Sequence, residues 1–215
     1  MEFKDVRATI EIDLEKGLEE LWRNLDKDAR WGVKKAKKED LKIKIGKQEN
    51  WDEFYKIYKR TIIRGGIAPK EKKELIKETD KLFLCLKNGI IIAGAAVKLR
   101  KDRVELFLNA SLKDFLKYQP NNILYWAIIV WSKEKGYKVF DLGGYQLGTR
   151  KGDKLYEVNR FKERWGGEIK EYEILSKNPF YILGRKIVRN INFVKRWRDK
   201  RKLKKYLENG KIKKP

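Results

Sequence analysis

The chain has 215 residues, of which 41% are hydrophobic and 40% charged, and its formal net charge is +23. This length allows one packed domain with appendages but not two full domains. The chain contains no histidine. This excludes Ser-His and Cys-His nucleophile systems, histidine general bases and histidine-containing zinc sites, so we expect no metal site.

The positive charge is concentrated near the C-terminus. Residues 177–215 hold 15 Lys/Arg against two acidic residues. Apolar residues at helical spacing alternate with these cations, which predicts a basic amphipathic helix. Such a helix can dock on the domain, lie on an anionic membrane or bind an RNA backbone, and the sequence leaves these alternatives open. A Lys/Glu-rich surface of the kind found in thermophiles also explains part of the charge elsewhere.

The sequence predicts a cytoplasmic protein. No apolar run reaches the ~18 residues needed to span a bilayer, and the N-terminus lacks the pattern of a signal peptide. The single cysteine, Cys85, lies on an apolar strand and is expected to be a buried, inert thiol, in keeping with a reducing compartment. A peripheral position at the inner face of the membrane is the alternative.

The first part of the chain alternates between short strand and helix patterns. Period-2 alternation of apolar residues indicates half-buried strands, and apolar residues three and four apart indicate helices. The expected elements are a strand over 7–12, helices over 14–38 with a break near Gly32, a strand over 41–45, a helix with a cap-like start at Asn50 that ends near Arg64, and a short helix from Pro69 to about Thr79.

The second part predicts an antiparallel meander followed by alternating helices and strands. Asn88-Gly89 is the strongest two-residue hairpin signal, and Pro120 and Gly136 mark the start and end of an apolar, deeply buried helix. The expected elements are strands over 81–87, 90–99 and 103–109, a helix over 121–135, a strand over 137–142, a helix over 154–164 and a strand over 168–175.

This order predicts an α+β fold with a mixed central sheet flanked by helices. We divide the chain into a strand and basic helical arm over residues 1–40, a central domain over 41–176 and the basic tail over 177–215. The sequence shows no internal repeat and no linker rich in Pro, Gly or Ser.

A series of short motifs then follows in a recognisable order. They are Ile92-Ala93-Gly94-Ala95, Asn109-Ala110-Ser111, Pro120-Asn121, Lys133-Glu134-Lys135-Gly136, Asp141-Leu142-Gly143-Gly144 and Phe161-Lys162 with Gly166-Gly167. In this order the chain resembles the FemABX-like aminoacyl transferases over residues 40–176. The resemblance implies a GNAT-like acyltransferase domain that moves an amino acid from tRNA to an amine of a cell-wall precursor.

Two departures from the family pattern bear on substrates. FemABX-like enzymes of the peptidoglycan bridge carry two such domains, whereas this chain has room for one, so a second domain in trans is left open. The loop that cradles coenzyme A in ordinary acetyl-CoA enzymes is glycine-rich, whereas Lys117 to Asn122 contains no glycine. We therefore expect no cofactor, with aminoacyl-tRNA as the donor and an acyl-CoA as the alternative.

The resemblance implies catalytic roles for Phe161 and Lys162. A lysine ammonium can stabilise the oxyanion that forms during amide synthesis, and Phe161 can stack on the terminal adenine of tRNA. Asp141, at a strand end, is a candidate to orient the amine or to act as base. The alternatives are that Phe161 belongs to the core, that Lys162 is a solvated helix residue and that Asp141 stabilises a turn.

Six further residues are candidates for substrate binding. Asn109 can donate to the acyl carbonyl, and Asn121 begins a helix whose N-terminus is a generic anion site. The others are expected to contact phosphate or sugar groups, although each is equally explained as a surface residue; they are Arg64, Tyr145, Lys34 and Lys35.

The sequence thus predicts an enzyme that transfers an aminoacyl group from aminoacyl-tRNA to an amine. The expected partners are tRNA, an amine-bearing cell-envelope precursor or peptide, and an anionic membrane surface through residues 177–215. A homo-oligomer is left open. The alternatives are an acyl-CoA-dependent N-acyltransferase and a non-catalytic module that binds RNA or membrane.

Overall fold

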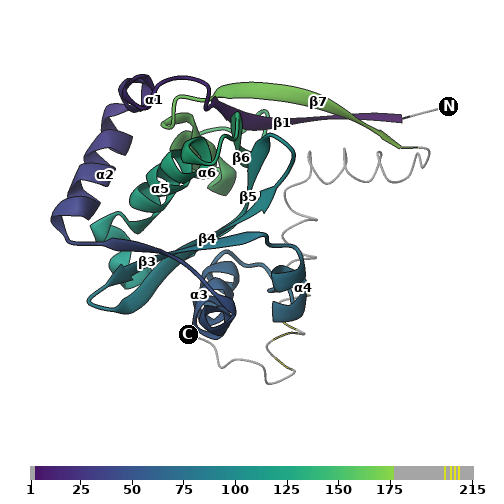
Figure 1. The fold of residues 1–215 in the computed structure, drawn as a ribbon. Coiled ribbons are helices and arrows are strands. Elements are labelled where there is room, and N and C mark those ends of the chain that lie inside the picture. The colour runs from purple at the N-terminus through teal and green to yellow at the C-terminus, as the bar shows by residue number, and fades with distance from the viewer. Residues whose placement is uncertain (1–2, 177–200, 202–203, 205, 207, 209–215) are drawn as a thin grey trace.

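The computed structural model describes residues 3–176 together with residues 201, 204, 206 and 208 (Figure 1). In chain order the elements are β1 (Phe3–Asp13), α1 (Leu18–Asn24), α2 (Lys27–Lys38), β2 (Lys42–Ile45), η1 (Gln48–Asn50), α3 (Trp51–Arg64), α4 (Lys72–Lys77), β3 (Lys81–Lys87), β4 (Ile90–Leu99), β5 (Arg103–Ser111), η2 (Lys113–Tyr118), α5 (Pro120–Glu134), β6 (Val139–Tyr145), α6 (Lys154–Glu163) and β7 (Glu168–Ser176).

The described strands form one mixed sheet in the order β2-β3-β4-β5-β6-β1-β7. The ladder between β5 and β6 is parallel, and the other ladders are antiparallel. The α+β class with a mixed sheet is therefore confirmed. The predicted hairpin at Asn88-Gly89 is also confirmed, because both residues have the positive φ, 50° and 79°, that a type I′ turn requires.

Helices cover both faces of the sheet, with α5 on one face and α3 and α4 on the other (Figure 1). Alternate residues of strand β3 belong to the two hydrophobic cores on opposite faces of the sheet. Phe83 and Cys85 belong to the core beneath α5, whereas Leu82 and Leu84 belong to the core beneath α3. Successive residues of a strand point to opposite faces, so burial on both faces produces the continuous apolar run in the sequence.

Small residues on β4 let α3 approach the sheet closely. A Cβ atom built on Gly94 would lie 2.6 Å from the ring of Phe54 on α3. The buried thiol of Cys85 agrees with the sequence prediction, and burial raises its pKa to about 12, which keeps it protonated and unreactive at neutral pH.

The predicted helix break near Gly32 is wrong. The chain breaks instead at Leu25-Asp26, where the Asp26 side chain accepts a hydrogen bond from the Asp28 backbone N–H at 2.8 Å and caps α2. Gly32 lies within α2, and a Cβ atom there would lie 1.8 Å from the amide nitrogen of Asn122 on α5. Glycine at this position therefore permits close packing of two helices.

Two other predicted helix starts differ from the structure. Asn50 makes no side-chain cap to α3; its Oδ1 accepts from the Lys47 backbone N–H at 2.9 Å within the preceding turn. Pro69 does not begin a helix, because α4 starts at Lys72.

Residues 1–40 do not stand apart as an arm. Strand β1 lies between β6 and β7, and its Ile10 and Ile12 share the α5 core with Leu21 of α1 and Val33 of α2. Most of the predicted basic tail lies outside the described residues. Of that segment, residues 201, 204, 206 and 208 are described, and all four are helical.

Candidate active site

The two parallel strands at the centre of the sheet separate after a short ladder. β5 and β6 pair only from Arg103 to Glu105 and from Val139 to Asp141. Beyond this ladder β5 pairs with β4 alone, with a bulge at Phe107 opposite Ala96 and Val97, and β6 pairs with β1. Beyond the ladder, the backbone N–H and C=O groups on the facing edges of β5 and β6 therefore do not hydrogen-bond one another. This region can receive a substrate.

The Lys162 side chain of α6 reaches the β6 side of this separation. It is buried, with 9% exposure, and its Nζ donates to the carbonyl oxygens of Gly143 at 3.1 Å and Gly144 at 2.8 Å. Successive carbonyls of a regular strand point in opposite directions. The positive φ of Gly143, 74°, interrupts this alternation and allows both oxygens to face one ammonium group.

The environment of Lys162 lowers its pKa to about 8. Burial is the main cause, and the nearby charge of Asp141 partly opposes it. An ammonium group has three N–H donors, and two are used by the carbonyls. The third is available to a substrate, and no ion pair within the described residues neutralises the charge.

Gly143 brings three elements together at this point. A Cβ atom on Gly143 would lie 3.0 Å from the Leu106 carbonyl oxygen of β5 and 3.8 Å from Lys162 Nζ. The lysine ammonium therefore lies where β5 and β6 run past each other without a hydrogen-bonded ladder. The double glycine that the sequence analysis singled out is what makes room for it.

Phe161 lies in an aromatic cluster between α5 and α6. Its ring centroid is 5.2 Å from that of Tyr125 and 6.2 Å from that of Trp165, both in edge-on geometry. The ring is half-buried and packs against the core, which favours the alternative structural role over a freely presented stacking surface. The packing fixes the turn of α6 that carries Lys162.

Asp141 is held in a polar network. Its Oδ1 accepts from the Gly143 backbone N–H at 2.7 Å and from the Thr9 hydroxyl, and its Oδ2 lies 3.3 Å from the Arg103 guanidinium, which also pairs with Glu11. Both carboxylate oxygens are therefore engaged. This arrangement favours the turn-stabilising alternative, and it leaves Asp141 as a fixed negative charge near Lys162.

A second polar group gathers where β5 ends. The Thr61 hydroxyl donates to the Ser111 carbonyl at 3.0 Å, and Arg64 Nη2 approaches the same oxygen at 3.5 Å. From α5, Asn121 Nδ2 lies 3.5 Å from the Ser111 hydroxyl, and its buried Oδ1 has no partner among the described residues. Asn109 points elsewhere, since its Nδ2 approaches Gly94 O at 3.4 Å on β4.

Tyr145 connects β6 to α6. Its hydroxyl donates to Glu163 Oε1 at 2.8 Å, and burial followed by this hydrogen bond raises its pKa. One residue that the sequence analysis missed lies beside it. Asn159 is 2% exposed and bonds both backbone groups of Gln146, which fixes the segment after β6. An asparagine within a predicted helix was the available signal, because asparagine is a poor helix former.

Lys34 and Lys35 lie on α2, and neither bonds a residue of the two groups. Lys34 is exposed, and Lys35 Nζ lies 4.9 Å from the ring centre of Trp31. No hydrogen bond or ion pair joins either lysine to the other predicted residues. The structure thus gathers Phe161, Lys162, Asp141 and Tyr145 around β6 and α6, places Arg64 and Asn121 at Ser111, and leaves Asn109, Lys34 and Lys35 outside both groups.

The α5 N-terminus is built without glycine. Gln119 adopts a left-handed φ of 61°, and its carbonyl accepts from the backbone N–H of Asn122 at 3.1 Å and of Ile123 at 3.5 Å. In residues 3–176 and the four described residues beyond, no cluster of Cys, Asp and Glu is placed to hold a metal ion. None of the helices among these residues has the length and apolar character needed to cross a bilayer.

Comparison with protein families gives two matches. Residues 1–73 match the FemAB family, and residues 77–163 match an acetyltransferase (GNAT) domain. The curated relatives include the lipid II:glycine glycyltransferases of Staphylococcus haemolyticus, 26% identical over 123 residues, and Staphylococcus saprophyticus, 27% identical over 123 residues. These alignments cover 54% and 55% of this chain, but each spans only 29% of the relative's length.

Two solved structures share the fold. The crystal structure of FemX aligns with a TM-score of 0.68 at 16% identity, over 82% of this chain and 63% of FemX. The C-terminal domain of a putative lysylphosphatidylglycerol synthetase from Agrobacterium fabrum aligns with a TM-score of 0.63 at 15% identity, over 88% of this chain and 66% of that one. The FemABX-like resemblance is thus confirmed by the match of residues 1–73 to the FemAB family, by the match of residues 77–163 to a GNAT acetyltransferase domain and by the fold shared with FemX.

Proposed function

We propose that this chain transfers an aminoacyl group from aminoacyl-tRNA to an amine of a cell-envelope or peptide-like acceptor. The observation that carries the proposal is the buried Lys162 ammonium beside the separated strands β5 and β6, in a chain that matches the FemAB family and a GNAT domain. The names of the curated relatives support lipid II, a cell-envelope precursor, as a model for the acceptor.

The reaction exchanges an ester for an amide. The neutral amine attacks the ester carbonyl, a C–N bond forms, and the C–O bond to the terminal ribose of tRNA breaks. The proton lost by the amine passes to the leaving oxygen. The third N–H of Lys162 donates to the oxyanion of the tetrahedral intermediate, and such a donor in a site with little water typically contributes about 10²–10³ in rate.

The remaining candidates support this centre in the proposal. Asp141 supplies a fixed negative charge that keeps Lys162 partly protonated near neutral pH, and Phe161 fixes the turn that carries it. Arg64 and Asn121 hold substrate phosphates at the end of β5, and Tyr145 keeps α6 against β6. Asn109, Lys34 and Lys35 contact the substrates outside this centre. A lipid-linked acceptor would bring the protein to the membrane surface.

A transfer assay tests the proposal. Labelled aminoacyl-tRNA is incubated with a lipid II preparation or a peptide amine, and the amide product is measured for the wild-type chain and for Lys162→Ala. We expect the variant to lose at least about 100-fold in rate while it stays folded. Lys98→Ala, on the other face of the sheet, is the control and should retain full activity. Unchanged transfer in Lys162→Ala would remove Lys162 from the mechanism.

An acyl-CoA donor is the second candidate, because the GNAT match over residues 77–163 favours it. Isothermal titration with coenzyme A distinguishes the two donors. Tight binding of coenzyme A, together with transfer from an acyl-CoA, would show that the donor is an acyl-CoA and not aminoacyl-tRNA. If neither donor gives product although polyanions bind, the chain is a non-catalytic module on this fold.

A further inference from the structure

The outer face of α3 carries a row of exposed cations. Lys56, Arg60 and Arg64 are each exposed and follow one another at intervals of four residues. Residues four apart lie on the same side of a helix, about 6 Å apart along the axis. The three side chains therefore form a stripe along the length of the helix.

The charges of this stripe are not neutralised locally. Within the described residues neither Lys56 nor Arg60 has a hydrogen bond or ion pair. Asp52, one turn before Lys56, is paired with Lys72 at 2.5 Å; this pairing is the main cause that lowers the pKa of Asp52, and the charge of Lys56 makes a smaller contribution. Unpaired cations in a row attract a polyanion.

The stripe ends at the second polar group, around Ser111 at the end of β5. Arg64 Nη2 approaches the Ser111 carbonyl, and one turn earlier Thr61 bonds the same residue. The Ser111 hydroxyl in turn meets Asn121 at the start of α5. A strand lying along α3 would therefore reach the end of β5 at Arg64.

The surroundings of the stripe favour nucleic acid over a lipid surface. Membrane-bound helices place large apolar side chains beside their cations, whereas no exposed large hydrophobic residue among the described ones lies on α3. Lys59 instead covers the half-buried ring of Tyr55 at 5.0 Å, and the Tyr55 hydroxyl donates to the Lys70 carbonyl oxygen at 3.1 Å.

We propose that α3 binds the phosphodiester backbone of a single-stranded RNA segment, with Lys56, Arg60 and Arg64 as successive phosphate contacts that direct the strand's end to Ser111. This inference rests on the proposed function, in which the donor is an aminoacyl-tRNA, and it names the path of the donor's single-stranded end. Contacts of this kind position a strand without reading its sequence.

The test measures the affinity of the full chain for a fluorescent, uncharged single-stranded RNA of about eight nucleotides by anisotropy over a salt series. We expect Lys56→Gln/Arg60→Gln to bind about tenfold more weakly and to reduce the salt slope by about 1.4, because each phosphate contact on a single strand contributes about 0.7. The control is Lys101→Gln/Lys135→Gln, which removes the same charge at the opposite end of β5 and α5, where both lysines are exposed.

Equal losses of RNA affinity in the two double variants would overturn the proposal, because the affinity would then depend on net charge and not on the position of the cations. The same chains are also sedimented with vesicles of phosphatidylglycerol and phosphatidylcholine. If the α3 variant loses vesicle binding but keeps RNA binding, the stripe is a membrane contact and the proposal fails. The probe carries no amino acid, and Lys162→Ala should bind it normally, so failure of the RNA path is distinguishable from failure of the transfer reaction.

Discussion

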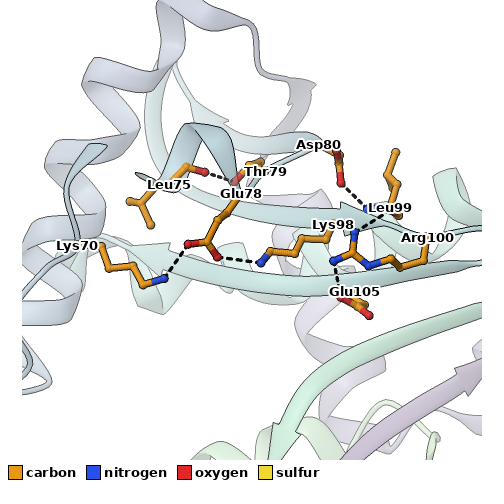
Figure 2. Close-up of polar contacts among 9 residues, drawn as sticks. All are labelled: Lys70, Leu75, Glu78, Thr79, Asp80, Lys98, Leu99, Arg100 and Glu105. Atoms are coloured by element: carbon orange, nitrogen blue, oxygen red, sulfur yellow. Dashed lines mark hydrogen bonds and ion pairs between the residues drawn. The ribbon is translucent and has the colours of Figure 1, made fainter. Parts of the chain in front are cut away.

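Two lysines on opposite faces of the same sheet show how burial and pairing separate a structural cation from a reactive one. Lys98 of β4 pairs with Glu78 at 2.9 Å, and Lys70 pairs with the same carboxylate at 3.0 Å (Figure 2). Among the described residues, the hydrogen-bond partners of Lys162 are the carbonyl oxygens of Gly143 and Gly144 and no carboxylate. Carbonyl dipoles orient an ammonium group but do not neutralise it, so burial lowers the pKa of Lys162.

The largest expected effect on stability concerns the burial of Lys162. Its pKa falls from 10.5 to about 8 in the folded chain, so the unfolded chain binds more protons between these pH values. Stability from this group should therefore rise with pH from about 8 to about 10.5, by at most about 3 kcal/mol. Urea unfolding of the wild-type chain and of Lys162→Met over this range measures the difference.

Lys98→Met is the matched control for the pH experiment. Lys98 pairs with Glu78 on the other face of the sheet, and its replacement leaves the buried Lys162 in place, so the alkaline rise of the wild-type chain should persist in this variant. If the unfolding free energies of wild type and Lys162→Met differ by the same amount at every pH from about 8 to about 10.5, burial of the Lys162 ammonium does not destabilise the fold.

The next effect comes from the glycine that makes room for the lysine. Gly143 and Gly148 have similar positive φ values, 74° and 71°, but only Gly143 has neighbours within 4 Å of an added Cβ atom. Alanine at either position should cost about 1–2 kcal/mol through the backbone. Gly143→Ala should also press on the Leu106 carbonyl and displace Lys162. We therefore expect transfer activity to fall only in Gly143→Ala. Urea unfolding measures the stability cost in both variants, and the transfer assay measures their activity. Equal activity in both variants would contradict this expectation.

The elements that depend on local signals were predicted well from the sequence. The Asn88-Gly89 hairpin and the helix between Pro120 and Gly136 follow from residues that fix their own backbone angles. The fold class followed from the order of such elements. Gly32 was misinterpreted because the reason for glycine lies in Asn122, a residue 90 positions away that packs against it.

The candidate site was predicted only in part. The motifs identify Lys162 and the double glycine, but they do not predict that the lysine bonds the glycine carbonyl oxygens, since this contact depends on how α6 packs against β6. The same holds for Asp141, whose engagement by Arg103 and Thr9 requires the ladder of β1 beside β6. Long-range packing decides which polar residues are reactive and which are structural.

The smallest expected effect belongs to the paired lysines. Lys98 and Lys70 lower the pKa of Glu78, so this carboxylate stabilises the fold above its unfolded pKa of 4.5, and that contribution is lost as the pH falls further. Glu78→Gln should therefore lower the melting temperature slightly at neutral pH, and the difference from wild type should shrink in acid. Exposed ion pairs contribute little, so the effect should stay below that of Lys162→Met. Transfer activity should be unchanged, because Glu78 bonds Lys70 and Lys98 and neither Lys162 nor a cation of the α3 stripe; a loss of activity in Glu78→Gln would show that this ion-pair network is coupled to the site.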